Sequence, residues 1–527
     1  MQLTYWVLLA LAILYIPLFI WVKVSPKAKG YGLHPYGPFI MIKTRLGIRA
    51  MDRVKHHKSL WNLFGLVSLA ITALLMVMLL YIIGASLINI TSNLSSPGIG
   101  IEYALAIPGL NPLLPITYGW IGLFAAMIIH EMAHGIQARA NDIKVESTGL
   151  LYAVVPMGAF VDPNEEDVVR SSVKARLHLY SAGISINFIT AVITFLLFST
   201  MIMGGMSTSH GDSAGVYGIT NDSPALDAGM PIGAIIDQVW YFDDGPGEWV
   251  PCDYEFSSDH TKSYAWSPGQ MVKVSYLTEN GEGITDEFRW GLYVERVAGG
   301  PAMEHLPDLA GNLILSMSIT RMGGSTTSYD IYGSPEFMSI MDMTTGDDLV
   351  SLVYMDASGN TTVSDEFKLD WRNGIGYLGI GATTSGMNIV DPVAILNQSV
   401  NPFYGADTMT EYAKSMVSYI SGPMRGMTPV PASIHWWYDA PMEEVFWVIV
   451  NILYWIFWLS IILAISNVLP AYPFDGGHIV AGCIEGLMLK RGIRDKARID
   501  AIVGRTMSVL SMFTILLFVL MISAIVF

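Results

Sequence analysis

The sequence predicts a polytopic α-helical membrane protein that carries a large, mainly-β insertion outside the bilayer. The chain of 527 residues is 52% hydrophobic and only 14% charged, whereas soluble domains carry about a quarter charged residues. Several apolar stretches reach the ~20 residues that a helix needs to cross the hydrocarbon core. Between two groups of these stretches lies an acidic block, residues 205–440, which contains 30 Asp and Glu against 9 Lys and Arg.

About six transmembrane helices are expected, at residues 3–22, 61–88, 117–138, 176–204, 443–467 and 504–527. Residues 23–60 hold nine Lys and Arg and a single acid, and residues 486–505 form a second basic cluster. Both segments are therefore expected on the cytoplasmic side. In this multi-pass cell-membrane topology, both termini and the acidic block are extracytoplasmic.

The acidic block narrows the choice of partners and compartments. Its excess of 21 negative charges argues against nucleic acid as a partner, because phosphates would be repelled. Cys252 and Cys483 are expected on opposite sides of the membrane, so an intrachain disulfide is not expected. Few cysteines and no long disordered tails are typical of a prokaryotic source, archaeal or bacterial.

Two segments of the acidic block share one order of elements. The first runs over residues 215–239 and 268–277, and the second over residues 291–317 and 345–359. Each pattern predicts a strand, a short helix opening at Pro-Ala, a glycine turn and further strands. This order resembles the PDZ domain, which binds an extended peptide along a sheet edge. The resemblance implies a tandem PDZ-like insertion, and the alternative is a generic β domain that serves as a spacer or size filter.

These patterns give the domain boundaries of the insertion. The first PDZ-like domain is expected at residues 212–290 and the second at residues 291–390. A linker and interfacial segment follows at residues 391–442, where Trp436, Trp437 and Tyr438 suit an aromatic belt at the outer membrane interface.

The stretch "AAMIIHEMAHGIQARA", residues 125–140, contains a His-Glu-x-x-His motif inside an expected span. On a helix His130 and His134 share one face and can bind the same metal ion, while Glu131 stays free to act as a general base. Ionisable residues within a span are costly and functional by default. The alternative, a histidine pair that is merely hydrogen-bonded, leaves Glu131 unexplained.

A second group of polar residues occurs in "NVLPAYPFDGGH", residues 467–478. Pro470 and Pro473 cannot continue a regular helix, and irregular backbone at membrane depth is tolerated only inside protein or beside a water-filled cavity. Tetrahedral catalytic zinc needs three protein ligands and one open position. Asp475 is the expected third ligand, and His478 is the alternative, although it is expected nearer the cytoplasmic surface.

The pairing of "HEMAH" with "NVLPAYPFDGG" resembles the site-2 protease family of intramembrane zinc metalloproteases. "AGISINF", residues 182–188, resembles the family's Ala-Gly-x-x-x-Asn pattern, and "LYAVVPMGAFVDP", residues 151–163, resembles its membrane-embedded β-hairpin. The catalytic core would then comprise residues 117–204 and 443–527. The two helices of residues 1–116, joined by a basic cytoplasmic loop, depart from the minimal pattern.

The resemblance implies that His130, His134 and Asp475 bind one Zn²⁺ ion and that Glu131 activates water. It further implies substrate contacts from the hairpin, at Gly158, Ala159, Phe160 and Val161.

Two asparagines in the expected spans have two interpretations each. Asn187 would donate to the tetrahedral oxyanion or hold substrate backbone, or it would form an interhelical hydrogen bond beside Gly183. Asn467 would contact a substrate strand or cap the broken helix.

The expected activity is cleavage of peptide bonds within or near transmembrane segments of other membrane proteins, after a first cut by another protease. Partners would be such transmembrane substrates and membrane lipid. A helix entering at Thr117 brings His130 ~20 Å along its axis, into the cytoplasmic half of a ~30 Å core.

Three alternatives to this activity are considered. One is a catalytically silent membrane chaperone or adaptor of the same fold. Another is a zinc transporter, which needs ligands along a path. The third is a protease of the prenyl-protein-processing kind, which would supply a Glu as the third ligand.

Overall fold

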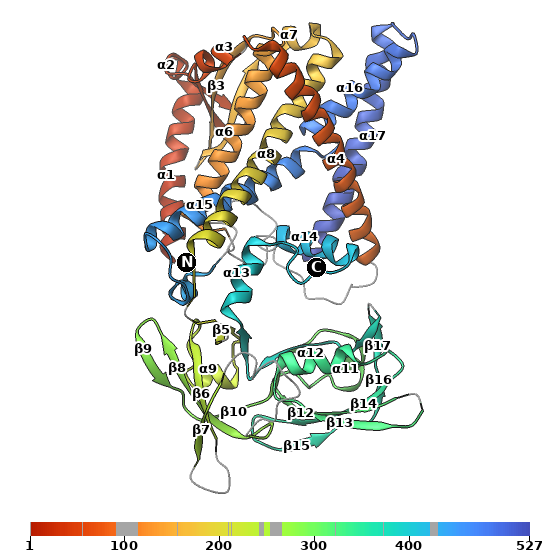
Figure 1. Ribbon diagram of the computed structural model, residues 1–527. Coiled ribbons are helices and arrows are strands. Elements are labelled where there is room, and N and C mark those ends of the chain that lie inside the picture. Colours follow the sequence, from red (N-terminus) through yellow and green to blue (C-terminus); the bar gives the residue numbers. More distant parts are fainter. Residues whose placement is uncertain are drawn as a thin grey trace. The chain divides into compact units, whose positions relative to one another are not determined.

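The computed structural model describes residues 2–54, 56–90, 114–154, 156–208, 210–211, 213–241, 247–252, 266–321, 323–372, 374–421 and 430–526. The chain divides into two compact units (Figure 1). The first comprises Met1–Ser199, Ile420–Met427 and Trp447–Phe527, and the second comprises Thr200–Tyr419 and Thr428–Phe446.

The first unit contains the long helices and one small sheet. Its helices are α1 (Gln2–Val24), α2 (Pro26–Gly30), α3 (Ile48–Val54), α4 (Lys58–Ile90), α6 (Ile116–Ala140), α7 (Glu165–Arg170), α8 (Val173–Gly205), α15 (Glu444–Asn467), α16 (Asp475–Lys490) and α17 (Lys496–Val526). Its strands are β1 (Leu33–Tyr36), β2 (Phe39–Thr44), β3 (Val145–Tyr152) and β4 (Pro156–Pro163).

Five helices in the described part of the chain are long and apolar enough to cross a membrane. They are Lys58–Gly84, Ile116–Ala140, Val173–Gly205, Glu444–Asn467 and Lys496–Leu517. Each corresponds to one of the spans predicted from the sequence. The first predicted span, residues 3–22, lies in α1, where the shorter segment Ile13–Val24 is apolar.

The predicted hairpin is present and belongs to a larger antiparallel sheet. The strand order is β1-β2-β3-β4, so β4 is an edge strand. The sequence interpretation treated residues 23–60 only as a basic loop and missed β1 and β2. A two-residue Gly37-Pro38 turn joins these strands, with Gly37 at φ 55°, as tight hairpins favour.

Helix α1 and the first hairpin pack together in one small core. Ile40 of β2 is buried with Val22 and Ala28, and Tyr152 of β3 packs against the same cluster. This packing explains why β1 and β2 form here although their sequence gave no long apolar run. The added strands support β3 and, through it, the edge strand β4.

The second unit is built on one extensive sheet. Its strands are β5 (Ala214–Ile219), β6 (Ile235–Tyr241), β7 (Glu248–Pro251), β8 (Met271–Thr278), β9 (Gly281–Ile284), β10 (Phe288–Arg289), β11 (Leu292–Val297), β12 (Leu313–Thr320), β13 (Thr326–Asp330), β14 (Leu349–Met355), β15 (Thr361–Val363), β16 (Phe367–Lys368), β17 (Asp370–Arg372), β18 (Ile375–Tyr377), β19 (Ile380–Thr384) and β20 (Met387–Val390). Strands β17 and β18 form a separate two-stranded sheet.

The helices of this unit are short. They are α9 (Pro224–Asp227), α11 (Gly300–His305), α12 (Ser334–Asp342), α13 (Pro392–Val400) and α14 (Met409–Ser421), with a 3₁₀ helix at Ala432–Trp437. The order strand, short helix, strand occurs twice, as β5-α9-β6 and as β11-α11-β12. This recurrence follows the repeat in the sequence.

Among the described residues of the second unit, each repeat has its own hydrophobic core. The second core draws on residues 292–378. The first core draws on residues 214–290 and also contains Met387 and Ile389 of β20, a strand that pairs with β5. The last strand of the segment predicted as the second domain therefore belongs to the first core.

The aromatic residues before α15 pack against protein in this unit. Trp437 is fully buried, and its indole Nε1 donates to the carbonyl of Gly233 at 2.9 Å. Tyr438 is 5% exposed and donates its hydroxyl to the carbonyl of Pro392. The prediction of an aromatic belt is therefore wrong for these two residues, because their polar atoms bond to backbone carbonyls of the β-rich unit.

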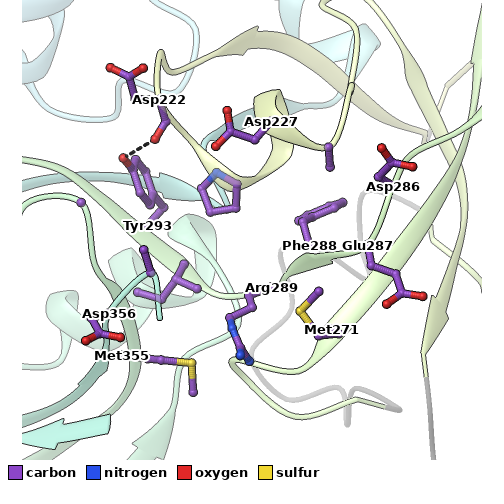
Figure 2. Close-up of a pocket in the computed structure, with 15 residues that line it drawn as sticks. Asp222, Asp227, Met271, Asp286, Glu287, Phe288, Arg289, Tyr293, Met355 and Asp356 are labelled. Carbon is purple, nitrogen blue, oxygen red and sulfur yellow. Dashed lines mark hydrogen bonds between the residues drawn. The ribbon is translucent and has the colours of Figure 1, made fainter. Parts of the chain in front are cut away.

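A cavity of about 330 Å³ is lined by residues of both repeats of the second unit (Figure 2). Five acidic residues line it, Asp222, Asp227, Asp286, Glu287 and Asp356. The Arg289 guanidinium, also on its wall, donates to the carbonyl of Gly269. The cavity accounts for part of the acidic excess and contains no residue of the predicted metal site.

Candidate metal site

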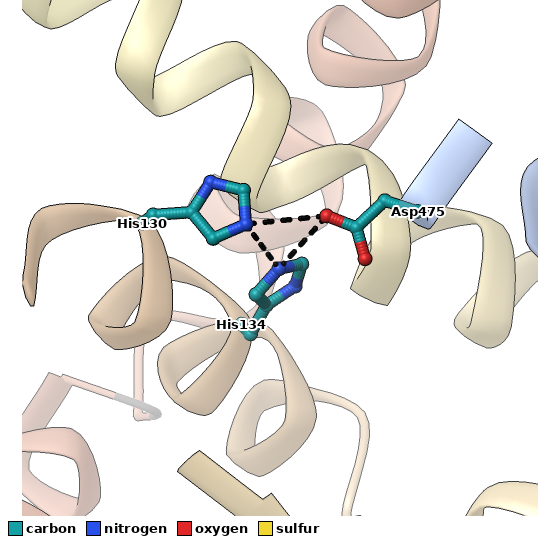
Figure 3. A group of neighbouring side chains, drawn as sticks. All are labelled: His130, His134 and Asp475. Carbon is teal, nitrogen blue, oxygen red and sulfur yellow. Dashed lines mark hydrogen bonds and ion pairs between the residues drawn. The ribbon is translucent and has the colours of Figure 1, made fainter. Parts of the chain in front are cut away.

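Helix α6 brings the two motif histidines onto one face. Nε2 of His130 and Nε2 of His134 lie 3.1 Å apart, and Oδ2 of Asp475 lies 3.2 Å from each of them. Figure 3 shows the three side chains converging from α6 and α16. All three ligand atoms thus form a nearly equilateral triangle.

This triangle fits a tetrahedral metal ion. Ligands at about 2.0–2.1 Å from zinc in tetrahedral geometry lie roughly 3.3 Å apart, close to the observed separations. Oδ2 of Asp475 is buried, and no described residue donates a hydrogen bond to it. Within the described residues, His130, His134 and Asp475 form the one group with metal-ligand spacing. The donor set therefore suits Zn²⁺ and leaves a fourth position for a further ligand.

A backbone carbonyl fixes the ring of His134. Nδ1 of His134 lies 2.8 Å from the carbonyl oxygen of Leu179. Because a carbonyl only accepts hydrogen bonds, Nδ1 must carry the proton, and the lone pair of Nε2 then points into the triangle. Such outer contacts orient metal-binding histidines. No sequence pattern marks this carbonyl, so the sequence interpretation missed it.

Asn187 contacts the other histidine. Nδ2 of its side-chain amide lies 3.2 Å from Nδ1 of His130, and Asn187 is fully buried. When His130 binds metal through Nε2, its Nδ1 carries a proton and needs an acceptor, so the amide must turn over to place its oxygen against Nδ1. The NH₂ then takes the position that Oδ1 now occupies. That position has no hydrogen-bond partner in the described structure.

The close approach of α8 to the histidines depends on Gly183. A β-carbon on Gly183 would overlap Nε2 of His134 and lie 2.8 Å from Nε2 of His130. The absence of a side chain here lets α8 cover the triangle while leaving room for an ion.

Asp475 is the first residue of α16, directly after the irregular segment 468–474. The two glycines that follow allow tight packing beneath that segment: a β-carbon on Gly476 would overlap the carbonyl oxygen of Val468, and one on Gly477 would lie 2.6 Å from the carbonyl carbon of Ala471. A carboxylate in the first turn of a helix is also favoured by the helix dipole. The Asp-Gly-Gly sequence thus serves both packing and charge placement.

The alternative third ligand, His478, has a different environment. Its ring stacks on Tyr180 with centroids 4.3 Å apart and an interplanar angle of 10°. It also meets the ring of Tyr472 at 4.8 Å. The group with metal-ligand spacing contains Asp475 and omits His478.

Glu131 points toward the small sheet. Its Oε2 accepts a hydrogen bond of 2.9 Å from the backbone N–H of Val161 in β4. One turn further along α6, a β-carbon on Gly135 would lie 2.6 Å from the Met51 side chain of α3 and 3.2 Å from the Val161 side chain, so this glycine permits the close approach of both α3 and β4. A carboxylate one residue from His130 and in contact with β4 can serve as a general base.

The other sequence-predicted residues lie nearby without entering the triangle. Gly158, Ala159 and Phe160 precede Val161 in β4. Asn467 ends α15, and its amide donates to the carbonyl of Leu463 at 3.0 Å. That bond corresponds to the capping role considered for Asn467.

A family of known proteins matches most of the chain. The model of Peptidase family M50 matches residues 118–514, which include both metal-binding motifs. The uncharacterized protein MJ0971 of Methanocaldococcus jannaschii is 31% identical over 191 residues, or 36% of this chain and 50% of that relative. The chain thus spans about half the length of this curated relative. Because the family match covers most of the chain and confirms the site-2 protease resemblance, the chain belongs to Peptidase family M50, a family of membrane-embedded zinc metalloproteases.

Proposed function

We propose that this protein is an intramembrane zinc endopeptidase that hydrolyses peptide bonds in or near transmembrane segments of other membrane proteins. The observation that carries the proposal is the convergence of His130, His134 and Asp475 beside a carboxylate that contacts an edge strand. His130, Glu131 and His134 all come from helix α6, which is apolar enough to span a membrane.

Each residue of the site has a role in this mechanism. His130, His134 and Asp475 would hold the ion, which supplies Lewis acidity toward water and the scissile carbonyl when bound. Glu131 takes the proton from the attacking water and passes it to the amine that leaves. The NH₂ of Asn187 is free to donate to the carbonyl oxygen of the substrate as negative charge develops there.

The edge strand β4 would hold the substrate. A peptide bond inside a helix is shielded, because its carbonyl is bonded within the helix. An extended segment can instead add to the free edge of β4, along Gly158, Ala159, Phe160 and Val161. Unwinding the substrate in this way exposes the bond to Glu131.

The charge distribution supports an orientation in which the site opens toward the cytoplasm. Residues 23–60 carry nine Lys and Arg, so we place them and the active site toward the cytoplasmic side. Both termini and the β-rich unit would then lie outside the cell membrane. There, the two repeats would act as tandem PDZ-like domains that admit substrates already cut by another protease.

Replacing Glu131 tests the activity directly. Purified protein is reconstituted into liposomes with a fluorescently labelled single-span peptide, and cleavage is followed by mass spectrometry. Glu131→Gln should lower the rate by at least about 100-fold with zinc content unchanged. Glu165→Gln, at an exposed position on α7, is the matched control and should cleave as the parent does. Undiminished cleavage by Glu131→Gln would refute the mechanism.

A further inference from the structure

The contact between Glu131 and Val161 joins the base to the strand that would bind the substrate. Oε2 of Glu131 accepts the N–H of Val161 at 2.9 Å, and both residues are partly buried. The contact is to backbone, so it does not depend on the identity of the side chain at position 161. It instead occupies a hydrogen-bond donor of the strand itself.

This N–H lies on the side of β4 that faces away from β3. Alternate residues of an antiparallel strand direct their N–H and C=O groups to opposite edges. Val161 is opposite Thr148, and Phe160 is opposite Gly149. Because the N–H of Val161 is bonded to Glu131, it is Phe160 that exchanges ladder bonds with β3. In the described part of the sheet no other strand pairs with β4, so Ala159 and Val161 present their backbone groups to an unpaired edge, which α6 approaches through Glu131.

An extended polypeptide that pairs with this edge therefore needs the N–H of Val161, which is already bonded to Glu131. A backbone N–H makes one strong hydrogen bond, so the carboxylate and an incoming carbonyl compete for it. We propose that Val161 latches Glu131 in the resting site, and that pairing of an extended substrate segment with β4 displaces the carboxylate and frees it to act. This inference rests on the proposed function, and it adds that strand pairing and activation of the base are one event.

Side-chain contacts hold β4, which carries the Val161 N–H, to the rest of the sheet. Asp162, the next residue of β4, forms a 2.8 Å ion pair with Lys43 of β2 and accepts a 3.0 Å hydrogen bond from Ser147 of β3. These contacts tie β4 to the sheet from the side opposite the open edge. The carboxylate, on a flexible side chain, is therefore the partner that moves.

The latch also provides selectivity. A segment that stays helical keeps its carbonyls bonded four residues along its own chain and offers Val161 no acceptor. Glu131 then stays bound, so helical neighbours in the bilayer are not attacked. Only an unwound segment has a free carbonyl that can replace the Glu131 carboxylate as the acceptor of the Val161 N–H.

Two inactive variants test the competition without any cleavage. Glu131→Gln keeps an oxygen that accepts from Val161, whereas Glu131→Ala removes the acceptor. The probe is a fluorescently labelled synthetic peptide with one apolar span of about 20 residues and a central Asn-Gly pair that favours unwinding. Its Kd is measured by anisotropy in nanodiscs, with equal zinc content verified for both variants. Glu131→Ala should bind the probe about three- to tenfold more tightly than Glu131→Gln, as expected for one hydrogen bond.

Proline substitutions in β4 locate the effect. Proline is tolerated on an edge strand where the N–H faces outward. Val161→Pro removes the contested donor, so Glu131→Ala and Glu131→Gln should bind equally in that background. Ala159→Pro removes a neighbouring edge donor that Glu131 does not touch, and should weaken both variants while preserving their difference.

Equal or weaker binding by Glu131→Ala would overturn the latch, as would the absence of probe binding by every variant. Glu131→Ala and Glu131→Gln both leave the sequence of β4 unaltered. Their Kd values therefore remain a valid test even if a proline variant fails to fold. Cleavage that survives Glu131→Gln would refute the proposed function while leaving this comparison of Kd values readable.

Discussion

Gly183 on α8 lies directly against His134 on α6, where a β-carbon on the glycine would overlap Nε2 of the histidine. We expect Gly183→Ala to intrude on the space of the ion and to weaken zinc binding about 10- to 100-fold, as loss of ligand orientation does. Zinc retained against a graded chelator, measured by mass spectrometry, gives the affinity. Gly204→Ala, on the same helix with nothing within 4 Å, should retain zinc, and equal losses in the two variants would contradict the steric argument.

Asn187 can be tested for its two predicted roles separately. Asn187→Ala removes the acceptor for Nδ1 of His130 and should weaken zinc binding about 10- to 100-fold. Asn187→Asp keeps an acceptor but loses the NH₂, so it should hold zinc more tightly than the alanine variant. Its cleavage rate should still fall about 10²- to 10³-fold if the NH₂ stabilises the oxyanion. Full activity in Asn187→Asp would limit this residue to positioning His130.

The choice between Asp475 and His478 as third ligand gives another prediction. Asp475→Ala removes one corner of the triangle and should weaken zinc binding by more than about 100-fold. His478→Ala removes a ring that stacks on Tyr180 and should leave the zinc stoichiometry unchanged, with a lower unfolding temperature. Comparable zinc loss in the two variants would restore His478 as a ligand.

Glu336 gives the β-rich unit a dependence on pH. This residue of α12 is 4% exposed, and its burial raises its pKa to about 7. The negative charge of Asp330 also raises the pKa, whereas a hydrogen bond from the N–H of Tyr332 lowers it. Because the pKa is higher in the folded state than in the unfolded state, the folded chain binds the proton more tightly. The contribution to stability is complete below pH ~4.5 and is lost as the pH rises through ~7.

The expected loss is on the order of 3 kcal/mol between pH 4.5 and pH 8. This loss of stability is measured by hydrogen exchange of the β14 amides in the full chain, corrected for the intrinsic exchange rate at each pH. Glu336→Gln should flatten this dependence and protect β14 more than the parent does at pH 8. Glu295→Gln, at an exposed position, should leave it unchanged. A slope that persists in Glu336→Gln would assign the dependence to another group.

The convergence of the three side chains in the candidate metal site was predictable from the sequence because its constraints are local. Helical spacing places His130 and His134 on one face, and the prolines before Asp475 break the chain where a ligand is needed. The Leu179 carbonyl and the contact between Glu131 and Val161 were not predictable, since both involve backbone atoms, which every residue supplies. Their partners are set by how α8 and β4 pack against α6.

The fold was predictable where hydrophobicity alone decides it, as in the five apolar helices. Strands β1 and β2 were missed because residues 33–44 form a sheet only by pairing with β3 and packing on α1. The aromatic residues near position 437 suited a membrane interface by composition, yet the carbonyl of Gly233, some 200 residues earlier, accepts the Trp437 indole N–H. Such distant pairings carry no local signal.

Strand β20 sets an order of events during synthesis. The core of the first repeat includes Met387 and Ile389, so it cannot close until the whole second repeat has left the ribosome. The second repeat, whose core lies within residues 292–378, can complete its own core earlier. The repeat that is translated first is therefore the one that matures last, and a chain truncated before β20 would expose its unfinished core to proteases of the surrounding compartment.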